Sequence, residues 1–271
     1  MNTNGSMAAT LETFELEIHG GAVERRYRSR CPHIEQMPWG TLDVSAFSPE
    51  ELIAARRGWS DLALQEYSAA ASLANMLRLV VRARAPLDVS AMLTSFPLEE
   101  LVHAELCVRM AEELGGVALV EYPTEELFPT PKTTGTDSPL VEATKAVVWE
   151  CCVAETLSHG ILEFHRRNAA QPLLKAVWGR LAKDEAAHAR FGWIFLAWAK
   201  DILTEAERKE VGANADRAIA MVETLHDKAR QAPDESFVNV GVFGARGRNA
   251  YIAESEGILE EKVVKRLRSF L

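Results

Sequence analysis

Several features that would mark a special class of protein are scarce in this sequence. Its 271 residues include only four cysteines and no Cys-x-x-Cys pair, so neither a rubredoxin-like iron site nor a zinc knuckle is encoded. No apolar run reaches the roughly 18 residues of a membrane span, and residues 1–21 lack an apolar core flanked by positive charge. We therefore expect a cytoplasmic protein that neither enters a membrane nor is exported.

Positive charge is also in short supply. Lys and Arg number 30 against 39 Asp and Glu, which gives a formal net charge of −9. Nucleic-acid surfaces need clustered cations, and the notable basic clusters, at 25–30 and 262–268, are short. The composition therefore argues against nucleic-acid binding. With 48% hydrophobic residues, the chain can bury one sizeable core, so a single domain is expected.

What the chain does contain is a repeated motif of acids and a histidine. Residues 99–104 read EELVHA and residues 184–189 read DEAAHA, each inside an apolar segment typical of a helix. Residues three apart on a helix share a face, so Glu100 can bind one cation together with His103, and Glu185 can do so with His188. The repeat indicates a site for two metal ions.

The acid that precedes each of these glutamates has its own expected role. Glu99 and Asp184 each lie one helical turn from the histidine of their own motif. A carboxylate there can accept the outer ring N–H of a metal-bound imidazole and fix its tautomer. We expect Glu99 to pair with His103 and Asp184 to pair with His188.

A third copy of the spacing, Glu223 with His226, is expected to be a coincidence. In a chain with this many acids and seven histidines, chance alone supplies about one Glu-x-x-His match. Val222 replaces the preceding acid, and no upstream helix carries a matching glutamate.

Each of the first two motifs has an upstream partner. Glu66 lies on an apolar helix face, where an ionised carboxylate needs a cation, a donor or a proton. Before the second motif stand Glu150 and Glu155. With a turn near 170–172, Glu155 comes level with Glu185, whereas Glu150 falls about 7 Å further along the axis. We favour Glu155.

The expected helices and strands follow from capping and turn residues and from the periodicity of apolar residues. Alternating polar and apolar residues around Gly20 and Gly21 predict a β-hairpin over 10–28. Ser48 and Pro49 open a helix to about Ala83, and a second helix spans about 87–114 with a kink or break near Pro97. The proline-rich stretch 117–138 predicts a long connection without regular helix, of the kind that lets the second and third helices of a bundle run parallel.

The second half of the chain predicts further helices. A third helix starts near Ser138, a fourth runs from Pro172 to just before Thr204, and Thr204 caps a fifth to about Gln231. A last helix closes the chain. The faces expected to pack on the bundle are Val211, Ala218, Met221, Val222 and Leu225 of the fifth helix and Ile258, Leu259, Val263, Val264 and Leu267 of the last.

The order Glu, then Glu-x-x-His, repeated once, resembles the ferritin-like di-iron carboxylate superfamily over residues 48–203. The resemblance implies an all-α fold: a four-helix bundle with a long crossover over 48–203, packed C-terminal helices over 204–271, and an extension with the β-hairpin over 1–47. The metal ligands it implies are Glu66, Glu100, His103, Glu155, Glu185 and His188. Two iron ions are the expected cofactor, and manganese or a mixed Mn/Fe pair suits the same ligands.

By this resemblance, the expected function is an oxidase or oxygenase that uses O2 to oxidise a small organic substrate, by hydroxylation or N-oxygenation. No nucleotide or flavin motif indicates the electron donor, and a homodimer fits the extra helices. His159 is a candidate seventh ligand or pocket residue. In the similar arylamine N-oxygenases the additional histidine lies one turn before the last glutamate, where this chain has Leu181. Phe191 and Phe195 are candidates for the pocket wall.

Other functions stay open. A ferroxidase or iron-binding protein would use the same ligands without an organic substrate, and a dimanganese catalase would act on peroxide. Hydroxylation of a modified tRNA base, another activity within this superfamily, is disfavoured by the negative charge. In a non-catalytic helical protein, the acids and histidines would form a satisfied polar network.

Overall fold

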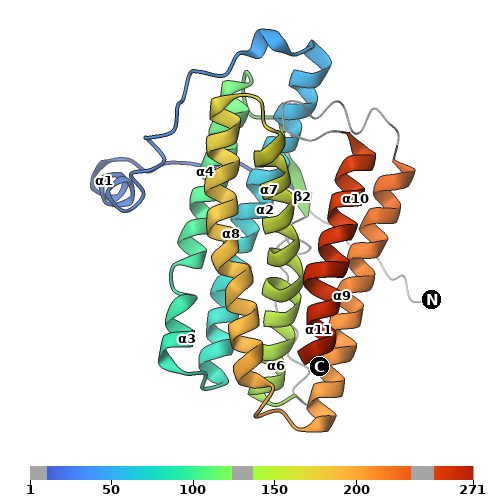
Figure 1. The fold of residues 1–271 in the computed structure, drawn as a ribbon. Helices are drawn as coiled ribbons and strands as arrows, with labels where there is room; N and C mark the ends of the chain where they lie inside the picture. Colours follow the sequence, from blue (N-terminus) through green and yellow to red (C-terminus); the bar gives the residue numbers. More distant parts are fainter. Residues whose placement is uncertain (1–10, 124–136, 233–246, 271) are drawn as a thin grey trace, which may run out of the picture.

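The protein is mostly helical, with one small antiparallel sheet (Figure 1). The computed structural model describes residues 11–123, 137–232 and 247–270. The elements are β1 Leu11–Thr13, α1 Gly21–Arg30, η1 Val44–Ala46, α2 Pro49–Arg82, α3 Leu87–Met92, α4 Phe96–Glu113, β2 Glu121–Pro123, α6 Pro139–Val147, η2 Val148–Glu155, α7 Thr156–Asn168, α8 Pro172–Ala199, α9 Glu205–Gln231, α10 Arg248–Ile258, η4 Leu259–Val264 and α11 Lys265–Phe270.

Helix ends follow the local chemistry that the sequence predicts. The Ser48 side chain accepts from the Glu51 N–H while Glu51 accepts from the Ser48 N–H, which satisfies two otherwise unpaired donors at the start of α2. Thr204 and Glu207 do the same for α9. Pro97 lies in the first turn of α4, where no helical N–H is required, and the chain breaks between α3 and α4 just before it. The predicted break is confirmed.

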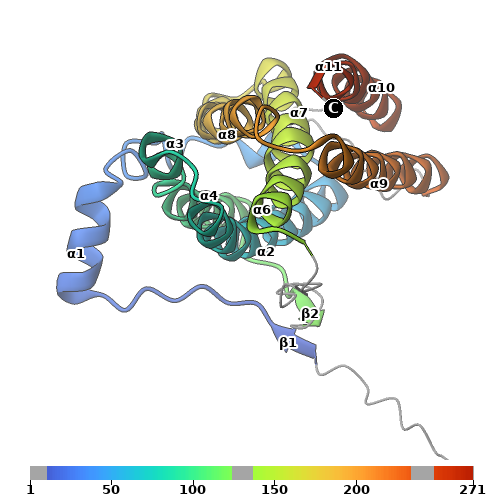
Figure 2. The same cartoon turned by 90° about the horizontal axis from the view of Figure 1, so that it is seen from below.

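Four long helical segments lie side by side: α2, α4, α6 continued through η2 and α7, and α8 (Figures 1 and 2). The chain turns back between α2 and α4 and again between α7 and α8. It leaves α4 at one end of the molecule and starts α6 at the other, so these two segments run parallel (Figure 1). The expected connection over 117–138 lies partly outside the described residues, and its described part contains β2.

The predicted N-terminal hairpin is wrong. β1 does not pair with a neighbouring strand but with β2, so that Leu11 lies opposite Pro123 and Thr13 opposite Glu121. Gly20 and Gly21 have positive φ angles and lead into helix α1 instead of a hairpin turn. The alternation seen in the sequence therefore reflects an extended segment, with Phe14 buried, whose strand partner is distant in the chain.

The C-terminal helices α9 and α10–α11 pack beside the third segment (Figures 1 and 2). All five residues predicted for the inner face of the last helix are buried. On α9, Val211 and Ala218 are buried and Val222 packs on the core, but Met221 and Leu225 are 53% and 52% exposed. Those two predictions are wrong, because the buried line of α9 runs through Val211, Ala215, Ala218 and His226.

The core divides into two apolar clusters stacked along the bundle. On α2, apolar residues up to Leu64 belong to one cluster and those from Leu73 onward to the other; on α8 the change falls between Ala182 and Phe191. The polar residues of the repeated motif lie at the level between the clusters. No described helix combines the length and the apolar character that crossing a lipid bilayer requires.

Candidate metal centre

Six buried side chains meet between the two apolar clusters. Glu66 comes from α2, Glu100 and His103 from α4, Glu155 from the end of η2, and Glu185 and His188 from α8. None is more than 8% exposed. They form two groups of four, Glu66, Glu100, His103 and Glu185 in one and Glu100, Glu155, Glu185 and His188 in the other, and within each group one ligand atom per residue lies within 4.8 Å of the others.

Glu100 and Glu185 belong to both groups because each faces both imidazoles. Glu100 Oε2 lies 3.3 Å from His103 Nδ1, and Glu100 Oε1 lies 3.0 Å from His188 Nδ1. Glu185 Oε1 lies 3.5 Å from His103 Nδ1, and its Oε2 lies 3.1 Å from His188 Nδ1. The two carboxylates therefore stand between the imidazoles, whose ring centroids are 6.3 Å apart.

The other two glutamates, Glu66 and Glu155, each face one imidazole. Glu66 Oε2 lies 3.4 Å from His103 Nδ1, and Glu155 Oε1 lies 3.9 Å from His188 Nδ1. The rejected alternative, Glu150, accepts a hydrogen bond of 2.7 Å from Ser72 Oγ. The fold thus brings Glu155 to the cluster, the glutamate expected from its position along the helix axis.

Electrostatics show how crowded with negative charge this cluster is. Burial raises the pKa of Glu66 to about 8, and burial together with the charge of Glu185 holds the pKa of Glu155 well above its usual range. Burial alone would lower the pKa of His188, but the close carboxylates of Glu100 and Glu185 outweigh it and raise that pKa to about 11. Without a cation, these raised pKa values favour protons on Glu66, Glu155 and His188.

The pKa values of Glu185 and Glu100 shift in the opposite direction. Burial favours the neutral form of both carboxyls. For Glu185 the hydrogen bonds with Glu155 and with the two imidazoles outweigh burial, and for Glu100 the two imidazoles do so. The pKa of each carboxyl is therefore lowered. Glu100 Oε1 is fully buried and accepts no hydrogen bond of good geometry from the described residues, although His188 Nδ1 is close. A buried carboxylate oxygen in that state is a fitting ligand for a cation.

The outer nitrogens of the two histidines are paired across the bundle. His103 Nε2 lies 3.2 Å from Asp184 Oδ2, and His188 Nε2 lies 2.9 Å from Glu99 Oε2. The prediction that each acid serves the histidine of its own motif is therefore wrong. Each imidazole turns Nδ1 to the glutamate one turn back on its own helix, so Nε2 points to the facing helix.

The two outer acids have different surroundings. Arg180 Nε lies 2.7 Å from Asp184 Oδ2, and the Asp184 side chain is 7% exposed. The Glu99 side chain is 25% exposed. Arg180 was missed from the sequence, although its position one turn before Asp184 on α8 is a usable signal.

The third helix is wound as a π-helix where it supplies Glu155. This segment, η2, ends at that residue, and π-helical turns occur frequently at functional sites. Gly192 of α8 lies against it: an added Cβ would stand 2.7 Å from the Cys151 Cβ and 2.9 Å from the Cys152 N. Glycine therefore permits the close approach of α8 to η2. No sequence pattern used above predicted the π-helix.

Three further candidates lie outside the two groups. His159 is half-buried on α7, where burial and the charge of Lys262 lower its pKa, and its role stays a prediction. Phe191 and Phe195 are fully buried in the apolar cluster below the site. A ring missed from the sequence, Phe96, packs directly on His188 with centroids 4.1 Å apart.

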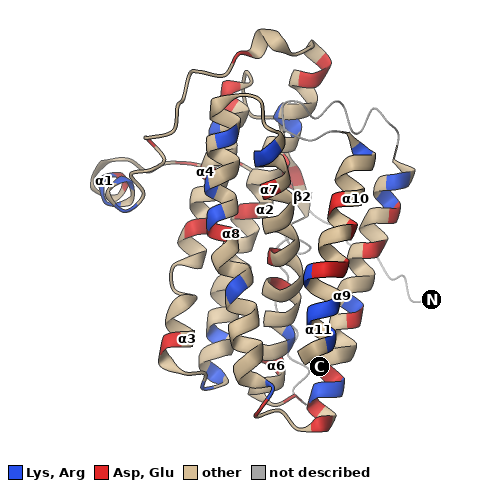
Figure 3. Ribbon diagram, in the orientation of Figure 1, with Lys and Arg blue, Asp and Glu red and all other residues tan. Residues whose placement is uncertain are grey.

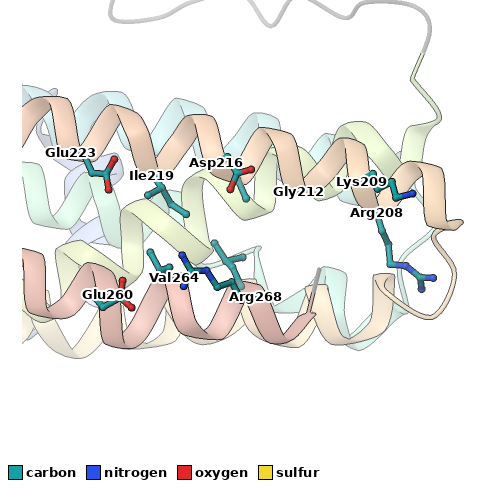
Figure 4. Close-up of a pocket in the computed structure, with 11 residues that line it drawn as sticks. Arg208, Lys209, Gly212, Asp216, Ile219, Glu223, Glu260, Val264 and Arg268 are labelled. Carbon is teal, nitrogen blue, oxygen red and sulfur yellow. The ribbon is translucent and has the colours of Figure 1, made fainter.

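A hollow of about 510 Å³ lies away from these residues, between α9 and the last helix (Figure 4). Arg208 and Lys209 stand at one end, and Glu223 and Glu260 at the other (Figure 4). It contains none of the six candidate ligands. The chemistry of the donor set, and not the size of this hollow, therefore identifies the candidate site.

Comparisons with protein-family models, with curated proteins and with solved structures find no match to this chain.

Proposed function

We propose that this chain is a ferritin-like di-iron protein that uses O2 to oxidise a small organic substrate. The observation that carries the proposal is the pair of carboxylates, Glu100 and Glu185, that each face both imidazoles. Two shared carboxylates, one further carboxylate on each side and one imidazole on each side form the ligand set of ferritin-like di-metal bundles. The helix directions and the long connection before α6 also support this bundle type.

The residues present suit two divalent cations. In one half-site Glu66 and His103 would be the terminal ligands, in the other Glu155 and His188, with Glu100 and Glu185 shared. Two divalent cations bring four positive charges to a cluster that otherwise holds protons on Glu66, Glu155 and both imidazoles. When bound, reduced iron supplies the electrons for the reduction of O2.

The chain's own residues prepare the site for this chemistry. Asp184 and Glu99 fix the orientation of the imidazoles by accepting the proton on Nε2, which leaves Nδ1 directed at the carboxylates. Phe96 covers the face of His188 and, with the apolar clusters on both sides, excludes bulk water. Burial raises the pKa values of Glu66 and Glu155 in the metal-free protein, so a bound cation would displace a proton from each of them.

The test is metal content by elemental analysis, followed by anaerobic loading with Fe(II) and optical monitoring as O2 is admitted. About two irons per chain, with a transient visible band that decays faster with an added amine or other small organic compound, is the expected result. Two irons oxidised with no transient band would favour a ferroxidase. Bound manganese with rapid decomposition of peroxide would favour a catalase, and the absence of bound metal would refute the proposal.

A further inference from the structure

Four aromatic rings form a continuous row across four helices. The Trp59 ring of α2 stacks on the Trp178 ring of α8, with centroids 4.2 Å apart. Trp178 in turn stacks on His165 of α7 at 4.9 Å, and His165 stacks on Tyr251 of α10 at 6.2 Å. The sequence does not predict this row, because each ring comes from a different helix.

One end of the row lies close to the candidate metal centre. Trp59 precedes Glu66, and Trp178 precedes Glu185, by about two helical turns, or roughly 10 Å along the axis. α2 and α8 run in the same direction (Figure 1). Both indoles are therefore displaced from the cluster toward the same end of the bundle. Trp59 and Trp178 are 0% and 2% exposed.

The other end of the row reaches the surface. His165 lies near the end of α7 and Tyr251 near the start of α10, and both are half-buried. The row therefore leads from the dry interior near the carboxylates to Tyr251, which is partly exposed where α10 packs on α7.

We propose that this row is an electron relay between the metal centre and a small one-electron reductant, such as ascorbate, at the Tyr251 face. The proposal rests on the proposed function. It names the route for electrons, which no nucleotide or flavin motif in the sequence supplies. Indole and phenol are among the side chains from which an electron is most readily removed, and close ring stacking favours transfer between them.

Each turnover of the relay moves one electron along the row of rings. One electron passes from the Trp59–Trp178 pair to an O2-oxidised metal pair, which leaves an indole radical cation. Tyr251 refills it with one electron across the His165 ring and loses its phenolic proton to solvent. Ascorbate then returns one electron and one proton to Tyr251, so the net change is one electron moved from ascorbate to the metals.

Another buried indole on the same helix provides a matched contrast. Trp193 is 4% exposed, but its ring neighbours are Phe270 at 6.1 Å and the Arg266 guanidinium at 4.3 Å. Phenylalanine is hard to oxidise, and an adjacent cation opposes the loss of an electron from the indole. Trp193 is thus as shielded as Trp178, but its ring contacts among the described residues include no indole, phenol or imidazole.

The first experiment needs no metal. The chelator-treated full chain is oxidised by flash photolysis with a soluble ruthenium tris-bipyridine complex and a quencher, and oxidised tryptophans are located by peptide mass mapping. We expect Trp59 and Trp178 to be oxidised several-fold more than Trp193, and Tyr251→Phe, which keeps the ring, to lower their oxidation at least threefold. Tyr67→Phe, a tyrosine outside the row, should change nothing. Equal oxidation of the three tryptophans, or no effect of Tyr251→Phe, would overturn the relay.

The second experiment uses the iron-loaded protein. Freeze-quenched samples taken after O2 is added should show an indole radical by electron paramagnetic resonance, and Trp178→Phe should abolish it. Ascorbate should shorten the life of the radical in the wild type and several-fold less in Tyr251→Phe. Oxidation of iron without this radical, and with ascorbate equally effective in both proteins, would also overturn the relay. A chain that binds no iron but passes the first experiment would refute the proposed function, and with it the metal end of the relay, while showing that charge still moves along the row of rings.

Discussion

The same Glu-x-x-His spacing occurs in two regions of this molecule with opposite outcomes. On α4 and α8, the motif brings Glu100, His103, Glu185 and His188 into one buried cluster. On α9, Glu223 and His226 belong to neither of the two ligand groups found among the described residues: His226 Nε2 pairs with Ser255 Oγ at 2.6 Å, and Glu223 lines the hollow beside the last helix.

The ionisation of the histidines shows the same contrast. All three are buried, and burial by itself lowers the pKa of an imidazole. For His226 that effect prevails, reinforced by Arg230, and its pKa is lowered. For His103 and His188 the surrounding carboxylates outweigh burial, and the pKa is raised. The difference teaches that the facing helix, and not the motif, creates the site.

The largest expected effect comes from removing one shared carboxylate. Glu100→Gln should lower bound metal from about two ions per chain to fewer than one, because Glu100 contributes to both half-sites. Elemental analysis after loading and desalting measures this. The control is Glu150→Gln, the same change at the glutamate that bonds to Ser72, which should retain the metal. Equal metal content in the two variants would contradict the site.

A smaller loss is expected from the outer acids. Asp184→Asn and Glu99→Gln should each weaken metal binding by about 10- to 100-fold, since each removes the charge that orients an imidazole. Competition with a chromophoric chelator measures the affinity. Glu223→Gln on α9 should leave it unchanged, and a comparable loss there would erase the distinction between the two regions.

The pH dependence should distinguish the loaded from the stripped protein. The pKa of Glu66 is raised from 4.5 to about 8, so its contribution to stability is present below pH 4.5 and is lost as the pH rises toward 8. The stripped protein should therefore have a lower Tm at about pH 8 than at about pH 6. In the loaded protein, cations replace these protons, so Tm should not fall over this range. A parallel decline in both would contradict the assignment of Glu66 as a ligand.

Glycines in the two regions should respond in opposite directions. Gly192→Ala should destabilise the protein by about 2 kcal/mol, because the new Cβ overlaps the backbone of η2. Gly212→Ala on α9, where nothing lies within 4 Å, should stabilise it by roughly 0.5 to 1 kcal/mol. Urea unfolding measures both. Gain of stability in both variants would show that α8 does not need its close approach to the π-helix.

For the third motif itself we expect a small loss of stability and no loss of metal. His226→Ala should cost about 1 kcal/mol through loss of the hydrogen bond to Ser255, with metal content unchanged. Urea unfolding and elemental analysis on the same sample separate the two readouts. Lost metal would mean that α9 belongs to the site after all.

The sequence predicts those features that local chemistry determines. The caps at Ser48 and Thr204 and the break near Pro97 depend on a few adjacent residues, and all three are confirmed. The convergence of six ligand-type side chains was also predictable, because an apolar helix face that carries a glutamate needs a compensating partner. The rise per residue of a helix then indicated that Glu155, and not Glu150, lies level with Glu185.

The features that were missed depend on contacts between distant segments. β1 pairs with β2 across more than a hundred residues, so alternation alone suggested a local hairpin. Met221 and Leu225 are apolar but face solvent, because the orientation of α9 depends on the helices beside it. Glu99 pairs with His188 and Asp184 with His103 because α4 and α8 face each other, and the sequence alone does not show which helices face each other.

The guanidinium behind Asp184 makes the two halves of the centre unequal. Arg180 pairs with the acid that supports His103, whereas Glu99, which supports His188, is partly exposed to solvent. The two half-sites therefore differ in charge and in solvent exposure, and they should hold a cation with different affinities. The centre is built to fill in sequence, so a titration with a single divalent metal should show two distinct steps, and a protein supplied with two different metals should sort them between the halves.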